Sequence, residues 1–145
     1  MLDSSPLSAL SLPARGQTIS IAQWSWACLA AGHRIYVPEV VDYELRRELL
    51  RAGKTASISR LDRLKTTFRY LPITTPAMLR AAQLWAASRR QGIPTGDPKK
   101  LDIDVILAAQ ALTLAVPPHE VVVATANVAH LSRFVAAALW SELAP

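Results

Sequence analysis

The stretch EVVVAT, residues 120–125, decides the fold class of this chain. Its centre is an unbroken apolar run rich in β-branched residues, which is typical of a strand buried on both faces. Such strands occupy the middle of parallel sheets that are covered by helices on each side. Ligands bind beyond the carboxyl ends of the strands in these sheets, so a functional site is expected where this stretch ends.

Strand-like and helical segments alternate on the N-terminal side of this stretch. Further strands are predicted at MLDSS (1–5), RIYVP (34–38) and RYLPIT (69–74). Helices are predicted over 19–32, 38–53, 57–69, 75–92 and 101–115, with another beginning at Asn127. The tail, 137–145, fits either a strand or a short helix. The alternation predicts an α/β fold with three α/β/α layers and a central, mostly parallel sheet, in one domain spanning residues 1–145.

The composition favours a globular protein with phosphate-bearing or acidic partners. Hydrophobic residues make up 51% of the chain, charged residues 19%, and the formal net charge is +5. No apolar run reaches the roughly 20 residues that a membrane span needs, and no signal peptide is expected. Cys28 is the single cysteine and is predicted to lie in the core, which suits a cytoplasmic protein.

Several basic residues are candidates for contact with RNA, with a solvated helix face as the alternative reading. They are Arg46, Arg47, Lys99 and Lys100. Contacts of this kind would give sequence-independent, salt-sensitive binding.

Polar side chains fall at the predicted carboxyl ends of several strands. Asp3 ends the first strand, Glu44 lies in the helix after RIYVP, and Thr125 and Asn127 follow EVVVAT. The helix LDIDVILAAQAL supplies two more acids, Asp102 and Asp104. Carboxylate and amide oxygens are the ligands that Mg²⁺ and Mn²⁺ prefer, and a cation would relieve the repulsion within such a group. The sequence therefore predicts a metal site at this edge of the sheet.

Each acid also has a simpler structural interpretation. Asp3 could be a turn residue. Asp102 suits the N-cap of its helix, and only from outside the regular helix could it reach the same site as Asp104. Glu48 competes with Glu44 on the helical wheel, but Glu44 lies about 6 Å nearer the strand end. Asp42 is expected to be a solvated charge.

In four motifs the chain resembles the PIN-domain family, and most of all the VapC-type toxins of bacterial toxin–antitoxin pairs. An apolar strand ending in Asp appears as MLDSS, and a Glu in the helix after the second strand appears in VVDYELRREL. An acid opens an apolar, Ala-rich helix in DVILAAQAL, and a strand runs into Thr-x-Asn in VVVATANVAHLSRF. The resemblance runs from Met1 to about Phe134. The chain departs from the family pattern in its Asp-Ser-Ser start and in having Asn at 127.

The resemblance implies an endoribonuclease that depends on Mg²⁺ or Mn²⁺ and is neutralised by a cognate antitoxin. By motif position, Asp3, Glu44 and Asp104 are the catalytic acids. Asp102 and Asn127 are further metal ligands, and Thr125 and Ser5 are supporting residues. The family also implies a homodimer in the cytoplasm. The alternatives are a catalytically weak or inactive module that binds RNA or a protein partner, and a nuclease that acts on DNA.

Overall fold

The computed structural model describes residues 1–12, 17–91 and 98–145, leaving aside the side chains of 17–19, 98–100 and 118. The helices of these residues are α1 (Ser4–Ser11), α2 (Gln17–Ala30), α3 (Glu39–Arg51), α4 (Thr55–Thr67), α5 (Thr75–Arg90), α6 (Pro98–Leu112) and α7 (Val128–Leu131). The strands are β1 (Tyr36–Pro38), β2 (Arg69–Leu71), β3 (Val123–Ala124) and β4 (Ala137–Ala138). Two short 3₁₀ helices, η1 (Pro118–Glu120) and η2 (Trp140–Glu142), complete the order.

The strands form two parallel pairs that the N-terminal residues join. β1 pairs with β2, and β3 pairs with β4. Between the pairs, Leu2 N–H donates to the Tyr36 carbonyl at 3.0 Å, and Ala124 N–H donates to the Met1 carbonyl at 2.8 Å. The resulting order is β2, β1, the first two residues, β3 and β4. The predicted α/β class and parallel pairing are confirmed, with strands only two or three residues long.

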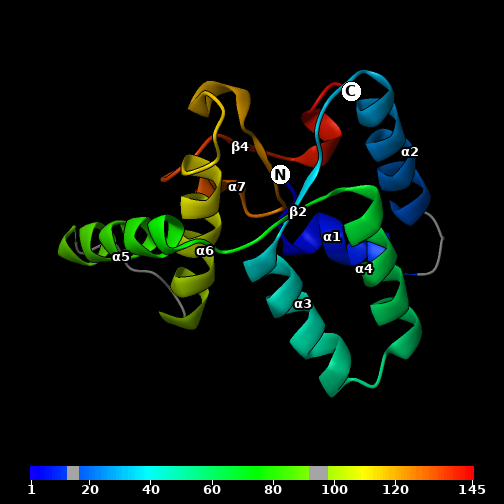
Figure 1. Cartoon of the computed structure of the whole chain (residues 1–145), viewed down its shortest axis with the longest axis horizontal. Coiled ribbons are helices and arrows are strands. Elements are labelled where there is room, and N and C mark those ends of the chain that lie inside the picture. Colours follow the sequence, from blue (N-terminus) through cyan, green and yellow to red (C-terminus); the bar gives the residue numbers. More distant parts are fainter. Residues whose placement is uncertain (13–16, 92–97) are drawn as a thin grey trace.

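Two groups of helices flank these strands. Helices α1, α2, α3 and α4 pack against one another on one side, and α5 packs across α6 on the other (Figure 1). The main core lies between the groups and contains the fully buried side chains of Leu2, Val37, Leu107 and Val123. Cys28 belongs to this core, as predicted, and burial raises the pKa of its thiol.

The first helix begins at Ser4, inside the stretch 1–5 that was predicted to be a strand. Only the first three residues take part in strand-like hydrogen bonds, and Ser4 and Ser5 begin α1 instead of extending a strand. Asp3 has an extended backbone and caps the helix, so the chain turns from sheet to helix at this carboxylate.

The end predicted at Gly32 for the helix over 19–32 is confirmed to within two residues, since α2 ends at Ala30. Gly32 has a φ of 89°, and the next amide, of His33, donates to the Cys28 carbonyl at 2.9 Å. This bond closes a Schellman motif, in which glycine adopts the left-handed backbone without a steric cost. The tail that could be strand or helix contains both, as β4 and η2.

Candidate active site

Asp3 lies at the point where the central strand segment becomes α1. One carboxylate oxygen, Oδ1, accepts a hydrogen bond from Ser4 N–H at 2.6 Å, which is the N-cap bond of the helix. The other oxygen, Oδ2, accepts from the Thr125 hydroxyl at 2.6 Å. The positive end of α1 also favours a negative charge here. Asp3 is therefore both the helix cap and a member of a hydroxyl–carboxylate network.

Thr125 connects the end of β3 to Asp3. Its side chain is fully buried, and its hydroxyl accepts from Asn127 N–H at 2.8 Å while donating to Asp3. One residue on, Ala126 N–H donates to the Ser5 hydroxyl at 3.0 Å. These bonds fix the loop after β3 against the first turn of α1.

Glu44 is the α3 acid that faces this network. Its carboxylate accepts a hydrogen bond from the Ser4 hydroxyl. Glu48, its competitor on the helical wheel, is half exposed and pairs with Arg51 at 2.8 Å instead. The structure thus places Glu44 beside Asp3, with Ser4 between them.

Asp104 lies one and a half turns into α6 and has a side chain only 17% exposed. Its Oδ2 is 3.8 Å from His130 Nδ1, on α7. Because His130 follows Asn127 by one helical turn, this contact brings α6 to the same loop that Thr125 holds.

The predicted N-cap role of Asp102 is wrong. Helix α6 begins at Pro98, a residue suited to a first turn, so Asp102 lies inside the regular helix and is exposed. Two residues correspond to about 200° around a helix, so Asp102 and Asp104 face different directions. Asp102 could reach the same site as Asp104 only from outside the regular helix, and it lies within the helix.

The acids are connected by intermediate groups. From α3 to α6 the contacts run through Glu44, Ser4, Asp3, Thr125, Asn127, His130 and Asp104, and the step from Asn127 to His130 is a backbone hydrogen bond of 3.2 Å. No group of three or more His, Cys, Asp or Glu side chains within the described residues is placed to hold a metal ion as it stands. The donors are mainly carboxylate oxygens, which is the chemistry that hard divalent cations require. The donor types therefore fit Mg²⁺ or Mn²⁺.

The family model of the PIN domain matches residues 1–137. The chain belongs to the PIN-domain family. Among the solved structures, the chain is similar to the crystal structure of VapBC2 from Rickettsia felis bound to a DNA fragment from their promoter. The match has a TM-score of 0.69 and 15% sequence identity, and it covers 97% of this chain and 97% of that one. No curated protein matches the chain. PIN domains are generally nucleases and generally use divalent metals.

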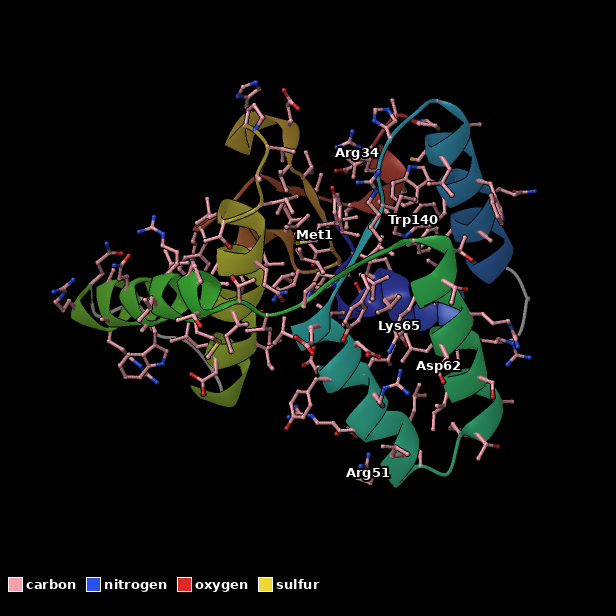
Figure 2. The ribbon with its side chains drawn as sticks, in the orientation of Figure 1. Met1, Arg34, Arg51, Asp62, Lys65 and Trp140 are labelled. Carbon is pink, nitrogen blue, oxygen red and sulfur yellow. The ribbon has the colours of Figure 1, made fainter. Side chains whose placement is uncertain are left out.

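One basic residue proposed for RNA contact is engaged within this PIN domain. Arg46 pairs with Asp42 at 2.9 Å and with Asp62 at 2.7 Å. Lys65 also pairs with Asp42, at 3.0 Å, and Figure 2 shows Asp62 and Lys65 on the side of α4 that faces α3. Asp42 is buried, so the expectation of a solvated charge is wrong. The predicted role of Arg46 in RNA contact loses support, because its guanidinium already joins α3 to α4.

Of the other basic candidates, the structure describes the side chain of Arg47 alone. Arg47 is 46% exposed, with its guanidinium 5.4 Å from the centre of the Tyr43 ring. The side chains of Lys99 and Lys100 lie outside the described residues.

Two residues of the network, Ser4 and His130, are not among the site residues predicted from the sequence. The adjacency of Ser4 to Asp3 and the three-residue spacing from Asn127 to His130 were the available signals. Neither spacing reveals a partner that lies 40 residues away for Ser4 and 26 for His130.

Proposed function

We propose that this PIN domain is a metal-dependent endoribonuclease and the toxin of a toxin–antitoxin pair. The observation that carries the proposal is the continuous network from Glu44 through Asp3 to Asp104 at the carboxyl ends of the strands. Its support is the family itself, in which nuclease activity with divalent metals is general.

Asp3, Glu44 and Asp104 are the residues proposed to hold the cation, directly or through water. When bound, Mg²⁺ or Mn²⁺ would supply an activated water and would stabilise the charge that develops on the phosphodiester. Asn127 makes no side-chain capping bond to α7, so its amide oxygen is a candidate neutral ligand. Asp102 is left out of the set because it is exposed and faces another direction.

The hydroxyl groups are proposed to orient these carboxylates. Thr125 directs one oxygen of Asp3, and Ser4 donates to Glu44. Ser5 supports the loop by accepting from Ala126 N–H. Without a cation nothing in this set of carboxylates offsets the negative charge that develops on the phosphodiester during cleavage, so cleavage should depend on the metal.

A matched pair of variants on α3 tests this function. The purified chain, free of any partner, is incubated with structured RNA in Mn²⁺ or in EDTA. We expect cleavage only with metal, a loss of about 100-fold or more in Glu44→Gln, and activity within about twofold of wild type in Glu48→Gln. Cleavage that persists in EDTA, or none with any divalent metal, would overturn the enzyme proposal. The second outcome would favour a module that binds without catalysis. Single-stranded DNA in the same assay tests the DNA-cleaving alternative.

A cognate antitoxin is the proposed partner. The structural neighbour from Rickettsia felis is itself a VapBC2 assembly on promoter DNA. In this chain α2 has no charged residue along Gln17–Ala30, yet Trp26 on that helix is 62% exposed. An exposed tryptophan on an uncharged helix is typical of a protein contact. Co-expression with the product of a neighbouring antitoxin gene, followed by co-purification of wild type and Trp26→Ser, measures whether that helix takes part.

Self-association is proposed as well. Helix α5 packs mainly on α6, and its outer side carries the exposed side chains of Met78 and Leu79. Light scattering after gel filtration should give a dimer for the wild type and a smaller species for Leu79→Glu. No helix of the described residues is long and apolar enough to cross a membrane, and a cytoplasmic location is part of the proposal.

A further inference from the structure

One strip of α3 presents both an acid of the proposed site and an exposed cation. Val40, Glu44 and Arg47 are spaced i, i+4 and i+7, so they lie along one side of the helix. That side faces α6 at its first turn, where Val40 is buried and its N–H is 3.5 Å from the Gln110 side-chain oxygen. One to two turns further on, Glu44 becomes half buried and Arg47 is exposed.

Tyr43 lies beside this strip and is 58% exposed. Arg47 follows it by four residues and holds its guanidinium 5.4 Å from the ring centre, within cation–π range. The interaction restrains both side chains without burying the ring. Tyr43 also immediately precedes Glu44, so its Cα lies about 1.5 Å along the helix axis from that of the acid that Ser4 contacts, about 100° around the helix.

The charges around Arg47 favour nucleic acid as the ligand of this strip, because the chain itself offers Arg47 little acidic surface to bind. The nearest acid to Arg47, Glu48, is 4.0 Å away and also pairs with Arg51, at 2.8 Å. The chain as a whole carries a net charge of +5. An exposed aromatic ring next to an arginine matches the surfaces on which unpaired bases stack while their phosphates meet a cation.

We propose that Tyr43 and Arg47 form a platform for single-stranded RNA, on which a base next to the cleaved phosphodiester stacks against Tyr43. Arg47 positions the ring and contacts the adjacent phosphate. The inference rests on the proposed function for its choice of RNA and deepens it, because it names the form of the substrate: a base in a duplex is stacked on its neighbours and cannot use the ring. The platform is distinct from the acids and should bind without metal.

The test is therefore a binding measurement in EDTA, where cleavage does not contribute. Fluorescence anisotropy is recorded with a labelled single-stranded RNA of about 12 nucleotides, and with its duplex, at low salt. We expect Tyr43→Ala to weaken binding of the single strand by about 5- to 100-fold, and Tyr43→Phe to bind like wild type. Leu50→Ala is the matched control, because Leu50 is 62% exposed on the same helix. The duplex should be insensitive to all three changes.

The outcomes separate this inference from the proposed function. Equal single-strand affinities for wild type, Tyr43→Ala and Leu50→Ala would overturn the platform, whatever the cleavage assay shows. A wild type that binds no RNA would also overturn it, and so would a Tyr43→Ala variant that loses antitoxin binding but keeps its RNA affinity, because the face would then be a protein interface. Loss of RNA affinity in Tyr43→Ala alone supports the platform even if no metal gives cleavage. Where cleavage occurs, the same variant should raise KM more than it lowers kcat, because the ring binds the base and does not take part in the chemistry.

Discussion

Replacement of Thr125 by valine tests the bond network at its centre. The hydroxyl donates to Asp3 at 2.6 Å and accepts from Asn127 N–H at 2.8 Å, in a fully buried position. Valine has nearly the same shape, so the change removes two hydrogen bonds without leaving a cavity. A bond to a charged group contributes about 1.5–3 kcal/mol and a neutral one about 0.5–1.5 kcal/mol, so the expected loss is about 2–4 kcal/mol of unfolding free energy. For a chain of this length the melting temperature should fall by about 5–15 °C.

The assay is urea denaturation followed by circular dichroism, with Thr113→Val as the control. Thr113 is exposed and its hydroxyl donates to the Ala109 carbonyl within α6, so its replacement should cost less than about 0.5 kcal/mol. The double variant Asp3→Asn with Thr125→Val should be more stable than the sum of the single losses predicts, by about 1 kcal/mol or more. Equal stabilities of the two valine variants, or full additivity with Asp3→Asn, would refute the assigned bond.

Three further predictions concern groups away from the site. Asp42→Ala should lower the unfolding free energy by about 2–3 kcal/mol, because it removes the buried partner of Arg46 and Lys65. Asp62 is exposed, so Asp62→Ala should lower the unfolding free energy by less than about 1 kcal/mol. Equal losses of the two variants in urea denaturation would contradict the buried network. Burial, with Asp42 nearby, raises the pKa of Tyr70 to about 12, so the neutral phenol stabilises the fold fully below pH 10 and this contribution is lost as the pH rises through 12. Tyr70→Phe should therefore flatten the fall in unfolding free energy between pH 10 and 12. Ultraviolet titration of the wild type should show one tyrosine that ionises late, and this variant should lack it. Cys28 is buried and its thiol pKa is raised by burial, so the native protein should react with a thiol reagent about 100-fold or more slowly than the protein in urea; comparable rates would place the thiol at the surface.

The sequence was informative where a local pattern determines the structure. The β-branched run before Thr125 predicts a buried strand because few other environments accept so many branched apolar side chains in succession. Gly32 predicts a helix end because glycine readily adopts the left-handed backbone that follows many helices, and its φ of 89° shows that conformation. The choice of Glu44 over Glu48 followed from the rise along the helix axis, and the structure places Glu44 beside Ser4.

The remaining features depend on contacts between distant segments. Asp42 looks like a solvated charge on the isolated α3 helix, and only the position of α4 shows that it is buried. Helix α6 begins at Pro98, three residues before the predicted start at 101, within a stretch dense in Pro, Gly and Lys. The approach of His130 to Asp104 depends on how α7 packs against α6, which no spacing in the sequence specifies.

The most direct test of the central claim compares two acids on the same helix. Asp104 is largely buried beside His130, whereas Asp102 is exposed and faces elsewhere. The measurement is the initial rate of RNA cleavage in Mn²⁺ by Asp104→Asn and Asp102→Asn, each purified free of partner. The account predicts a loss of about 100-fold or more for Asp104→Asn and a rate within about twofold of wild type for Asp102→Asn. Full activity in Asp104→Asn, or equal losses in both variants, would contradict it.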